Sequence, residues 1–368
     1  MQKVSAFLRR KDIVFSPKRY FIDAMSAMAQ GLFCTLLVGT ILNTLGTQLH
    51  IGFLTDIIVT LGKGDGAVGY TIGGLCSAMV GPGMAVAIGQ ALNAPPMVLF
   101  SLIPVGFATN AMGGAGGPLA VLFVAIIAAE IGKAVSKETK IDILVTPIVT
   151  ILSGIGAAAL IAAPIGTAAS AVGKAIMWAT ELQPFFMGII VSVVIGIALT
   201  LPISSAAICA ALGLTGLAGG AAVAGCCTQM VGFAVMSFRE NRWGGLAAQG
   251  LGTSMLQMGN IVRNPRIWIP PTLASAITGP IATCIFRMEM NGAAVSSGMG
   301  TCGLVGQIGV YTGWLADIEA GSKAAITATD WLGLVLICFV LPALLSWLIA
   351  LPLRKWGWIK ENDLKLDL

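Results

Sequence analysis

The sequence predicts an all-α protein, a polytopic membrane helical bundle of about ten transmembrane helices with two re-entrant segments and an internal duplication. Three observations predict it. No Asp, Glu, Lys or Arg occurs in residues 66–129. The same sparseness recurs over residues 143–238, where only Lys174 and Glu181 interrupt. Hydrophobic residues make up 57% of the chain and its mean hydropathy is +0.91, which excludes an ordinary soluble domain with a charged surface.

Long uncharged runs are placed in the membrane because a charge at the bilayer centre costs about 2.5–3.5 kcal/mol. A hydrocarbon core about 30 Å thick requires about 20 apolar residues per helix. The predicted spans are 26–47, 67–92, 97–112, 117–134, 143–162, 184–202, 205–236, 244–260, 267–287 and 331–352. The stretch 205–236 is too long for one straight helix, so we expect a break near Gly219 and Gly220. The two segments expected to be re-entrant are 163–180 and 291–313.

The charged residues predict how the chain is oriented. Residues 1–25 are basic with an interrupted apolar face, which favours an amphipathic helix on the cytoplasmic membrane surface over a merely solvated basic tail. Residues 26–353 form the membrane domain and residues 354–368 a cytoplasmic tail. Loops rich in Lys and Arg lie in the cytoplasm by the positive-inside rule, which places both termini there. Loops 56–65 and 317–330 are then outside, and only Arg239 and Arg242 fall on the wrong side.

Two stretches of the chain resemble each other. The sequence Glu-Ile-Gly-Lys-Ala-Val at 130–135 matches Gln-Met-Gly-Asn-Ile-Val at 257–262, and each is followed by a basic residue, an Ile and a Pro. Pro82 and the Ala-Ile and Ala-Leu pairs after it match Pro202 and its followers. We interpret these matches as repeat halves at about 67–180 and 184–313; chance resemblance in a low-complexity chain is the alternative. Carriers commonly bind substrate where such repeats meet.

The best candidates for substrate binding are Glu289 and Asn291. Polar groups within the membrane are costly, so the few deep ones are functional candidates. These two stand at the mouth of a Gly-rich, flexible stretch, residues 292–303. Carboxylate and carboxamide groups are suited to bind sugar hydroxyls. The alternative is an ion pair between Arg287 and Glu289 that merely closes a helix end.

Four further residues are candidates for the same role. Glu130 ends the longest uncharged run, and it either faces a polar cavity or marks the membrane boundary beside Lys133. Its counterpart in the second half is Gln257, with Asn260 one turn away. Asn110 ends another predicted span.

Other residues carry less weight as candidates. Thr228 and Gln229 could line a path or simply pack, and His50 is more typical of a residue at the membrane boundary.

Several classes of function are excluded or disfavoured. No segment combines dense Lys and Arg with exposed aromatics, so no nucleic-acid partner is expected. No Gly-x-x-x-x-Gly-Lys-Ser/Thr loop occurs, so the chain does not hydrolyse ATP. A single histidine and the lack of a CxxC motif predict no metal site, no cofactor and no catalytic centre, and the eight cysteines are interpreted as small core residues.

The chain resembles one family, the membrane (IIC) subunits of the phosphoenolpyruvate-dependent sugar phosphotransferase systems of bacteria, and within it the branch of PfoR-type membrane regulators. The resemblance spans residues 15–355 and rests on residues 29–33, 39–46, 136–143 with Pro147, and 290–306. It implies a protein of the bacterial cell membrane that binds a sugar and works with cytoplasmic IIA and IIB phosphocarriers. Relatives in the glucose-type superfamily form homodimers and hold the sugar near a Glu and a His. Glu289 matches the carboxylate, but no His lies near it.

Three functions remain open from the sequence. The first is a sugar permease subunit that binds and translocates a sugar or related small polar solute for phosphorylation by a separate IIB protein. The second is a membrane sensor that controls gene expression through a partner and transports nothing. The third is an ion-coupled secondary transporter, with Glu130 or Glu289 at the ion site.

Overall fold

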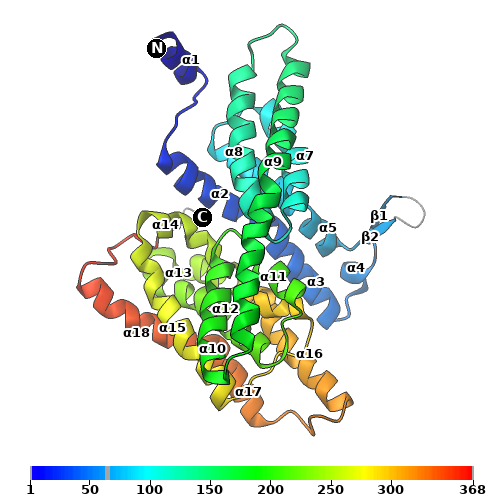
Figure 1. Cartoon of the computed structure of the whole chain (residues 1–368), viewed down its shortest axis with the longest axis vertical. Helices are drawn as coiled ribbons and strands as arrows, with labels where there is room; N and C mark the ends of the chain where they lie inside the picture. The colour runs from blue at the N-terminus through cyan, green and yellow to red at the C-terminus, as the bar shows by residue number, and fades with distance from the viewer. Residues whose placement is uncertain (1, 63–66, 367–368) are drawn as a thin grey trace. The chain divides into compact units, whose positions relative to one another are not determined.

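The computed structural model describes residues 2–62 and 67–366, and almost all of its regular structure is helical (Figure 1). The prediction of a helical membrane bundle is confirmed. The described residues contain one small sheet, in which β1 (Val59–Leu61) pairs antiparallel with β2 (Val68–Tyr70). The chain divides into two compact units, Met1–Ala168 and Ala169–Leu368. The parts of the predicted N-terminal helix, outer loop and tail at residues 1, 63–66 and 367–368 lie outside the described residues.

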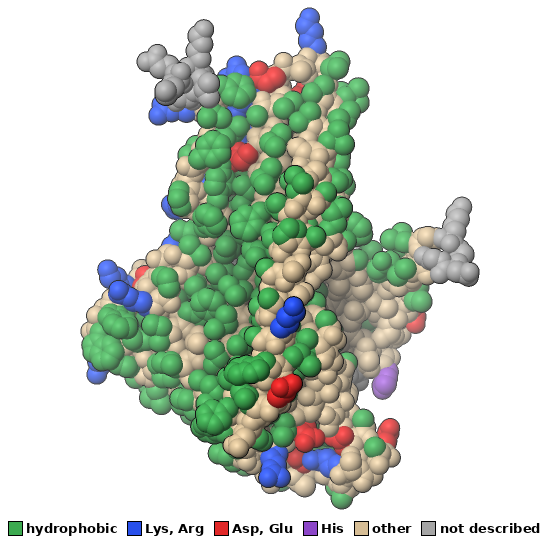
Figure 2. All heavy atoms as spheres, viewed as in Figure 1, with side chains coloured by type: hydrophobic (Ala, Val, Ile, Leu, Met, Phe, Trp, Pro, Cys, Tyr) green, Lys and Arg blue, Asp and Glu red, His purple; other side chains and the backbone are tan. Residues whose placement is uncertain are grey.

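Within the described residues, five helical runs are long and apolar enough to cross a membrane, or six if the bent pair α5–α6 forms one span. The five runs are Arg19–Thr47, Pro96–Val135, Asp142–Thr180, Gly216–Met236 and Ala328–Lys355. The expected number of ten is therefore not confirmed. Figure 2 shows hydrophobic side chains over much of the visible surface with few charged ones among them, as a surrounding bilayer requires.

Unit 1 is built around helices that pack in a sequential series. α6 packs against α2 and α7, and α7 packs against α8. The turn between α7 and α8 passes through Gly114, whose φ of 52° suits glycine, and brings Gly117 back against Asn110. The elements of this unit are α1 (Gln2–Arg10), η1 (Arg19–Asp23), α2 (Ala24–Leu32), η2 (Phe33–Leu37), α3 (Val38–Gln48), α4 (Gly52–Thr55), α5 (Ile72–Ala78), α6 (Val80–Ala91), α7 (Pro96–Gly113), η4 (Gly114–Gly116), α8 (Gly117–Val135) and the first part of α9 (Asp142–Thr180).

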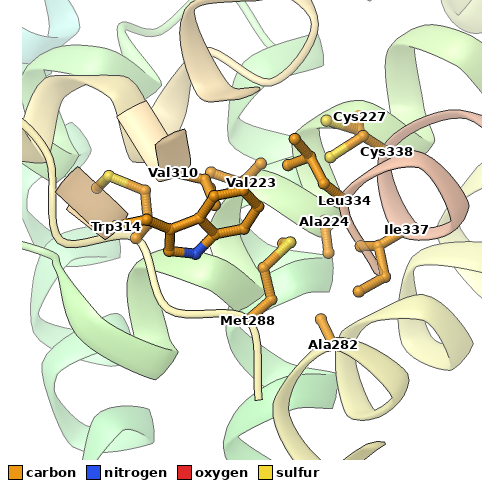
Figure 3. Close-up of a cluster of buried hydrophobic side chains, with 11 residues drawn as sticks. Val223, Ala224, Cys227, Ala282, Met288, Val310, Trp314, Leu334, Ile337 and Cys338 are labelled. Atoms are coloured by element: carbon orange, nitrogen blue, oxygen red, sulfur yellow. The ribbon is translucent and has the colours of Figure 1, made fainter. Parts of the chain in front are cut away.

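Unit 2 is organised around α12, which is almost entirely buried and packs against α10, α15 and α18. Its elements after α9 are α10 (Pro184–Thr200), α11 (Ser205–Leu212), α12 (Gly216–Met236), α13 (Phe238–Ala247), η5 (Ala248–Gly252), η6 (Ser254–Gln257), α14 (Met258–Arg263), η7 (Pro265–Trp268), α15 (Ile269–Pro280), η8 (Ile281–Ile285), η9 (Ala294–Gly298), η10 (Cys302–Leu304), α16 (Val305–Glu319), α17 (Ala328–Val335), η11 (Leu336–Val340) and α18 (Leu341–Lys355). One buried apolar cluster joins α12 to α16 and η11 through Val223, Trp314 and Ile337 (Figure 3).

Glycines let the helices around α12 approach closely. A Cβ at Gly225 of α12 would overlap the backbone of Ser192 in α10. A Cβ at Gly279 of α15 would overlap the carbonyl of Gly188, also in α10. Transmembrane helices associate through such close backbone packing because lipid offers no hydrophobic drive. The abundance of glycine in this chain therefore has a packing function here.

The expected re-entrant segment 163–180 is wrong. Residues 142–180 form one continuous helix, α9, with Pro147 and Pro164 inside it. A proline removes one helical hydrogen bond, but the neighbouring backbone can adjust around it in a membrane helix. The small residues of this stretch are thus compatible with an unbroken helix, and composition alone did not reveal that.

The breaks elsewhere also differ from those expected. The stretch 205–236 breaks at residues 213–215 because Gly213 ends α11 in the left-handed conformation, whereas Gly219 and Gly220 lie inside α12. The predicted span 244–260 is a series of short helices, η5, η6 and α14 among them. The stretch 291–313 holds two short 3-10 turns and the start of α16. It is packed rather than flexible, since Ser297 and Thr301 are fully buried.

The close contact of α10 with α12 predicts the effect of one methyl group. Gly225→Ala should lower stability by about 1–3 kcal/mol or more, because the added carbon meets backbone that cannot rotate away. The matched control is Gly156→Ala on α9, where nothing lies within 4 Å. It should be neutral or stabilising by up to about 1 kcal/mol. Thermal unfolding of the detergent-solubilised variants measures both, and equal melting temperatures would contradict the packing assignment.

Candidate functional site

The non-helical chain after η8 is tied to the start of α12. The backbone reverses at Arg287, whose φ is 45°. Gly216 N then donates to Met290 O and Met290 N donates to Gly216 O, both at 3.0 Å. Non-helical backbone in a membrane protein is tolerated where it is buried in protein or lines a water-filled cavity. This bridge gives the backbone N–H and C=O groups of Gly216 and Met290 hydrogen-bond partners at the point where α12 begins. The side chains of Glu289 and Asn291 are not needed for these two bonds.

Asn291 braces three segments with one side chain. Its Oδ1 accepts a hydrogen bond from Gly216 N at 3.1 Å. Its Nδ2 donates to Glu289 Oε2 at 3.1 Å and to Asp317 of α16, at 3.0 Å to Oδ2 and 3.2 Å to Oδ1. Both amide hydrogens are therefore used. The sequence predicted Asn291 as a direct ligand; the geometry makes it the residue that holds two carboxylates in place.

The two carboxylates keep unused capacity to accept hydrogen bonds. A carboxylate has about four acceptor positions, and the amide of Asn291 occupies few of them. Glu289 is exposed and Asp317 is half-buried. No ion pair among the described residues involves either of them, and none joins Arg287 to Glu289. Glu289 and Asp317 can therefore accept hydrogen bonds from the hydroxyls of a ligand.

These carboxylates border an open cavity of about 240 Å³ within unit 2. Trp314, only 4% exposed, forms part of its wall, and Lys323 Nζ lies 5.7 Å from the centre of a Trp314 ring. Lys323 also pairs with Asp330 at 2.9 Å. The cavity is lined by Arg287, Glu289, Trp314, Asp317, Ser322, Lys323 and Asp330. It combines carboxylate acceptors, cationic donors and an aromatic surface, a set suited to a small polyhydroxylated molecule.

The sequence did not identify Asp317 and Trp314 as site residues. Asp317 was counted only as a charge of the outer loop 317–330. The signal that could have found both is their spacing, because residues three apart lie on the same helix face. On α16 this spacing puts both side chains at the cavity beside Glu289.

Asn110 lies in unit 1, near the end of α7. Its side chain is half-buried and sits where α6, α7 and α8 meet, against Gly81 and Gly117. Both of those glycines lack the Cβ that would collide with it. Asn110 therefore occupies a closely packed helix junction in unit 1.

Glu130 and Lys133 form a buried ion pair in unit 1, at the end of α8. Lys133 Nζ lies 3.0 Å from Glu130 Oε2, and the two residues are 2% and 9% exposed. Tyr20 Oη donates to Glu130 Oε1 at 3.0 Å. Lys133 Nζ also donates to the backbone carbonyls of Leu92 at 2.9 Å and Asp12 at 2.7 Å. The pair thus holds the N-terminal segment against the helix bundle, and Lys133 also lines an open polar cavity of about 390 Å³.

The N-terminal segment is fixed by further charges. Arg19 donates to Asp12 Oδ2 at 2.6 Å, and this bond lowers the pKa of Asp12 to about 2. Because the folded-state pKa is depressed, the stabilisation is complete above pH about 4 and is lost as the pH falls towards 2. Lys11 and Arg10 lie against Glu138 and lower the pKa of its carboxyl. The segment stays anchored at physiological pH.

Gln257 and Asn260 hold the C-terminal segment of unit 2 in a similar way. Gln257 Nε2 donates to Leu364 O at 2.9 Å and to Gln249 Oε1 at 2.8 Å. Asn260 Nδ2 donates to Lys365 O and to Gln257 Oε1, both at 2.8 Å. Every amide hydrogen of these two residues is used, so we do not place them in a ligand site.

The two anchoring pairs occupy equivalent positions of the proposed repeat. With Gly132 aligned to Gly259, Glu130 corresponds to Gln257 and Lys133 to Asn260. Each pair is spaced three residues apart, near the end of α8 in unit 1 and across the junction of η6 with α14 in unit 2, and each bonds backbone carbonyls of a terminal segment. One half uses an ion pair and the other a pair of amides. This correspondence supports the duplication.

The other sequence candidates have ordinary structural partners. Thr228 Oγ1 lies 2.9 Å from Thr278 Oγ1, inside the contact of α12 with α15. Gln229 is fully buried and accepts a hydrogen bond from Trp268 Nε1 at 2.9 Å. His50 is exposed just beyond α3.

Comparison with known protein families decides the class. The family model described as "Phosphotransferase system, EIIC" matches residues 22–366. The chain belongs to this family. Neither the curated proteins nor the solved structures contain a match.

As an EIIC chain, the protein is a multi-pass membrane component of a sugar phosphotransferase system. Membership implies a sugar substrate and cytoplasmic IIA and IIB partners. The match does not distinguish the PfoR-type branch, which stays a prediction from the sequence.

The equivalence of the two anchoring pairs in this EIIC chain can be tested by exchange. Glu130→Gln alone should lower the free energy of unfolding by about 3–5 kcal/mol, because it leaves the buried Lys133 ammonium without its counter-charge. The double variant Glu130→Gln with Lys133→Asn recreates the amide pair and should be more stable than the sum of the single effects predicts. Unfolding of the four proteins in a double-mutant cycle measures the coupling, and simple additivity would refute the equivalence.

Proposed function

We propose that this EIIC chain binds a sugar at the cavity of unit 2 and translocates it for phosphorylation by a separate IIB protein. The observation that carries the proposal is the brace made by Asn291, which holds the carboxylates of Glu289 and Asp317 beside one cavity. In this arrangement the two carboxylates accept sugar hydroxyls, while Asn291 positions them.

The chemistry of the cavity supports a sugar over an inorganic ion. Two carboxylates without ion-pair partners lie beside Lys323 and Arg287, so acceptors and donors are both present. A sugar hydroxyl both donates and accepts, and it can use both kinds of group. The apolar ring of Trp314 offers a surface for the carbon–hydrogen face of a sugar ring.

The location of the cavity also supports this function. It lies beside loop 317–330, which the charge distribution places outside the membrane, and at the start of α12. A broken helix whose N-terminus meets an irregular segment is a common way to build a substrate site in a carrier. We further propose that the protein lies in the bacterial cell membrane with both termini in the cytoplasm, and that it forms a homodimer, as the family resemblance implies.

Substitutions at the cavity should weaken sugar binding. Glu289→Gln and Asp317→Asn each replace a charged acceptor, and loss of a hydrogen bond to a charged group costs about 1.5–3 kcal/mol, or about 10- to 100-fold in Kd. Calorimetry of the purified protein with a panel of hexoses, amino sugars and hexitols measures this. The matched control is Glu319→Gln, an exposed residue of α16 outside the cavity, which should bind as the parent protein does. Unchanged affinity in both cavity variants would remove this cavity from the site.

Uptake separates transport from the alternatives. Vesicles that contain the protein together with IIA, IIB and a phosphate donor should accumulate sugar phosphate, and omission of IIB should abolish accumulation. Binding without flux in the complete system would identify a sensor. Flux that persists without phosphocarriers and collapses with the ion gradient would identify an ion-coupled transporter.

A further inference from the structure

The backbone of the C-terminal tail of unit 2 is held by hydrogen bonds from a set of amide side chains. Within the tail, Leu364 is fully buried and Ile359 is 2% exposed. The tail lies beside α14, since Asn260 Nδ2 donates to Lys365 O. The set consists of five amide side chains between the end of α12 and the start of α15, four that bond the tail and Gln249, which bonds Gln257: Asn241, Gln249, Gln257, Asn260 and Asn264. We call this set the amide ladder.

The amide ladder bonds mainly to the backbone of the tail. Leu364 O accepts from Gln257 and also from Asn241 Nδ2, the latter at 2.7 Å. Leu366 N donates back to Asn241 Oδ1 at 2.8 Å. Asn264 Nδ2 donates to Trp358 O at 2.8 Å. Hydrogen bonds depend steeply on distance and angle, so these bonds form together only when the tail lies in one position against the amide ladder. A shift of the ladder therefore breaks several of these bonds at once.

The amide ladder is connected directly to α12. Gln249 Nε2 donates at 2.8 Å to Ser237 Oγ, which caps the C-terminal end of that helix. Arg354, just before the tail, donates to Met236 O at 2.9 Å and pairs with Glu240 at 3.2 Å. The last turn of α12 is therefore bonded to the ladder and to the root of the tail.

The opposite end of α12 is bonded to the candidate sugar site. Gly216 N donates to Asn291 Oδ1, and Gly216 is bridged to Met290. The helix has 21 residues, which span about 31 Å at 1.5 Å per residue, the thickness of the hydrocarbon core. One buried, continuous helix thus bonds at its first residue to Asn291, which holds two carboxylates of the cavity, and at its last turn to the ladder and the root of the tail.

From this arrangement we propose that the C-terminal tail is an output element whose attachment reports the state of the sugar site through α12. A sugar bound to Glu289 and Asp317 changes the bonds that Asn291 makes to the start of α12. The displaced helix shifts Ser237 and Gln249, and the tail is released from the amide ladder for a cytoplasmic partner to bind. The sugar step rests on the proposed function; the mechanical link between Asn291 and the tail does not.

Hydrogen exchange of the full-length protein in lipid nanodiscs, without sugar, tests the link. Asn291→Ala should speed exchange of the tail peptide, residues 356–366, by about tenfold. Gly216→Ala, which strains the start of α12 at its φ of 64° without a steric clash, should do the same. Gln257→Leu should release the tail directly. Glu319→Gln is the control on α16 and should change nothing.

The N-terminal segment of unit 1 serves as an internal reference. Residues 10–16, anchored by Lys133, should exchange at the parent rate in all four variants, which separates a specific effect from general unfolding. Parent-rate tail exchange in both Asn291→Ala and Gly216→Ala overturns the link through α12. Parent-rate exchange in Gln257→Leu overturns the role of the ladder.

A sugar arm then tests the proposal on the parent protein. A sugar that binds in the calorimetric assay should speed tail exchange, and this response should be lost in Glu289→Gln. Binding without any change at the tail overturns the output role while the sugar site stands. Failure of every sugar to bind contradicts the proposed function, and the variants without sugar still decide whether α12 connects the two ends.

Discussion

Backbone hydrogen-bonding groups that leave a helix inside a membrane protein must find partners within the protein. Lipid supplies none, and each unpaired group costs several kcal/mol. In unit 2, two of the places where the chain leaves helical geometry are the segment around Met290 and the C-terminal tail after α18. At both, amide side chains supply the missing partners. Asn291 does so at the start of α12, and the amide ladder does so beyond its end.

Carboxamides suit this task because each offers two donors and an acceptor without a net charge. A buried ion pair can do the same work, as Glu130 and Lys133 show in unit 1, but loss of either partner then leaves a charge without compensation. At positions that the proposed repeat aligns, the two units attach a terminal segment with different chemistry, an ion pair in unit 1 and amides in unit 2. At the cavity the amide has a second consequence: Asn291 brings Glu289 and Asp317 together although both are negative, and both line the cavity with acceptor positions to spare.

The features that follow from hydropathy were predictable from the sequence. Uncharged apolar runs placed α7, α8 and α10 within a few residues, because a membrane helix must exclude charge over its whole length. The same rule failed at 244–260 and 163–180. In the first, buried Gln249 and Gln257 bond to each other, to Ser237 and to Leu364 of the distant tail, so that the apolar run conceals a broken chain. In the second, composition could not tell a hairpin from a straight helix.

The site was half predictable for a similar reason. Glu289 and Asn291 stood out because they are polar residues next to a Gly-rich apolar stretch. Asp317 lies 26 positions further along the chain than Asn291, and only the fold brings the two into contact. The proposed repeat aligns Glu130 with Gln257, yet the anchoring contacts at these positions were not visible, since they involve backbone carbonyls that no sequence pattern marks.

The most direct test of the account is an experimental structure of the protein in a lipid nanodisc with the sugar that binds it most tightly. The account predicts density for the sugar within hydrogen-bonding distance of Glu289 and Asp317, with Asn291 still joined to the first residue of α12. Sugar density elsewhere, with these two carboxylates turned to open solvent, would contradict it.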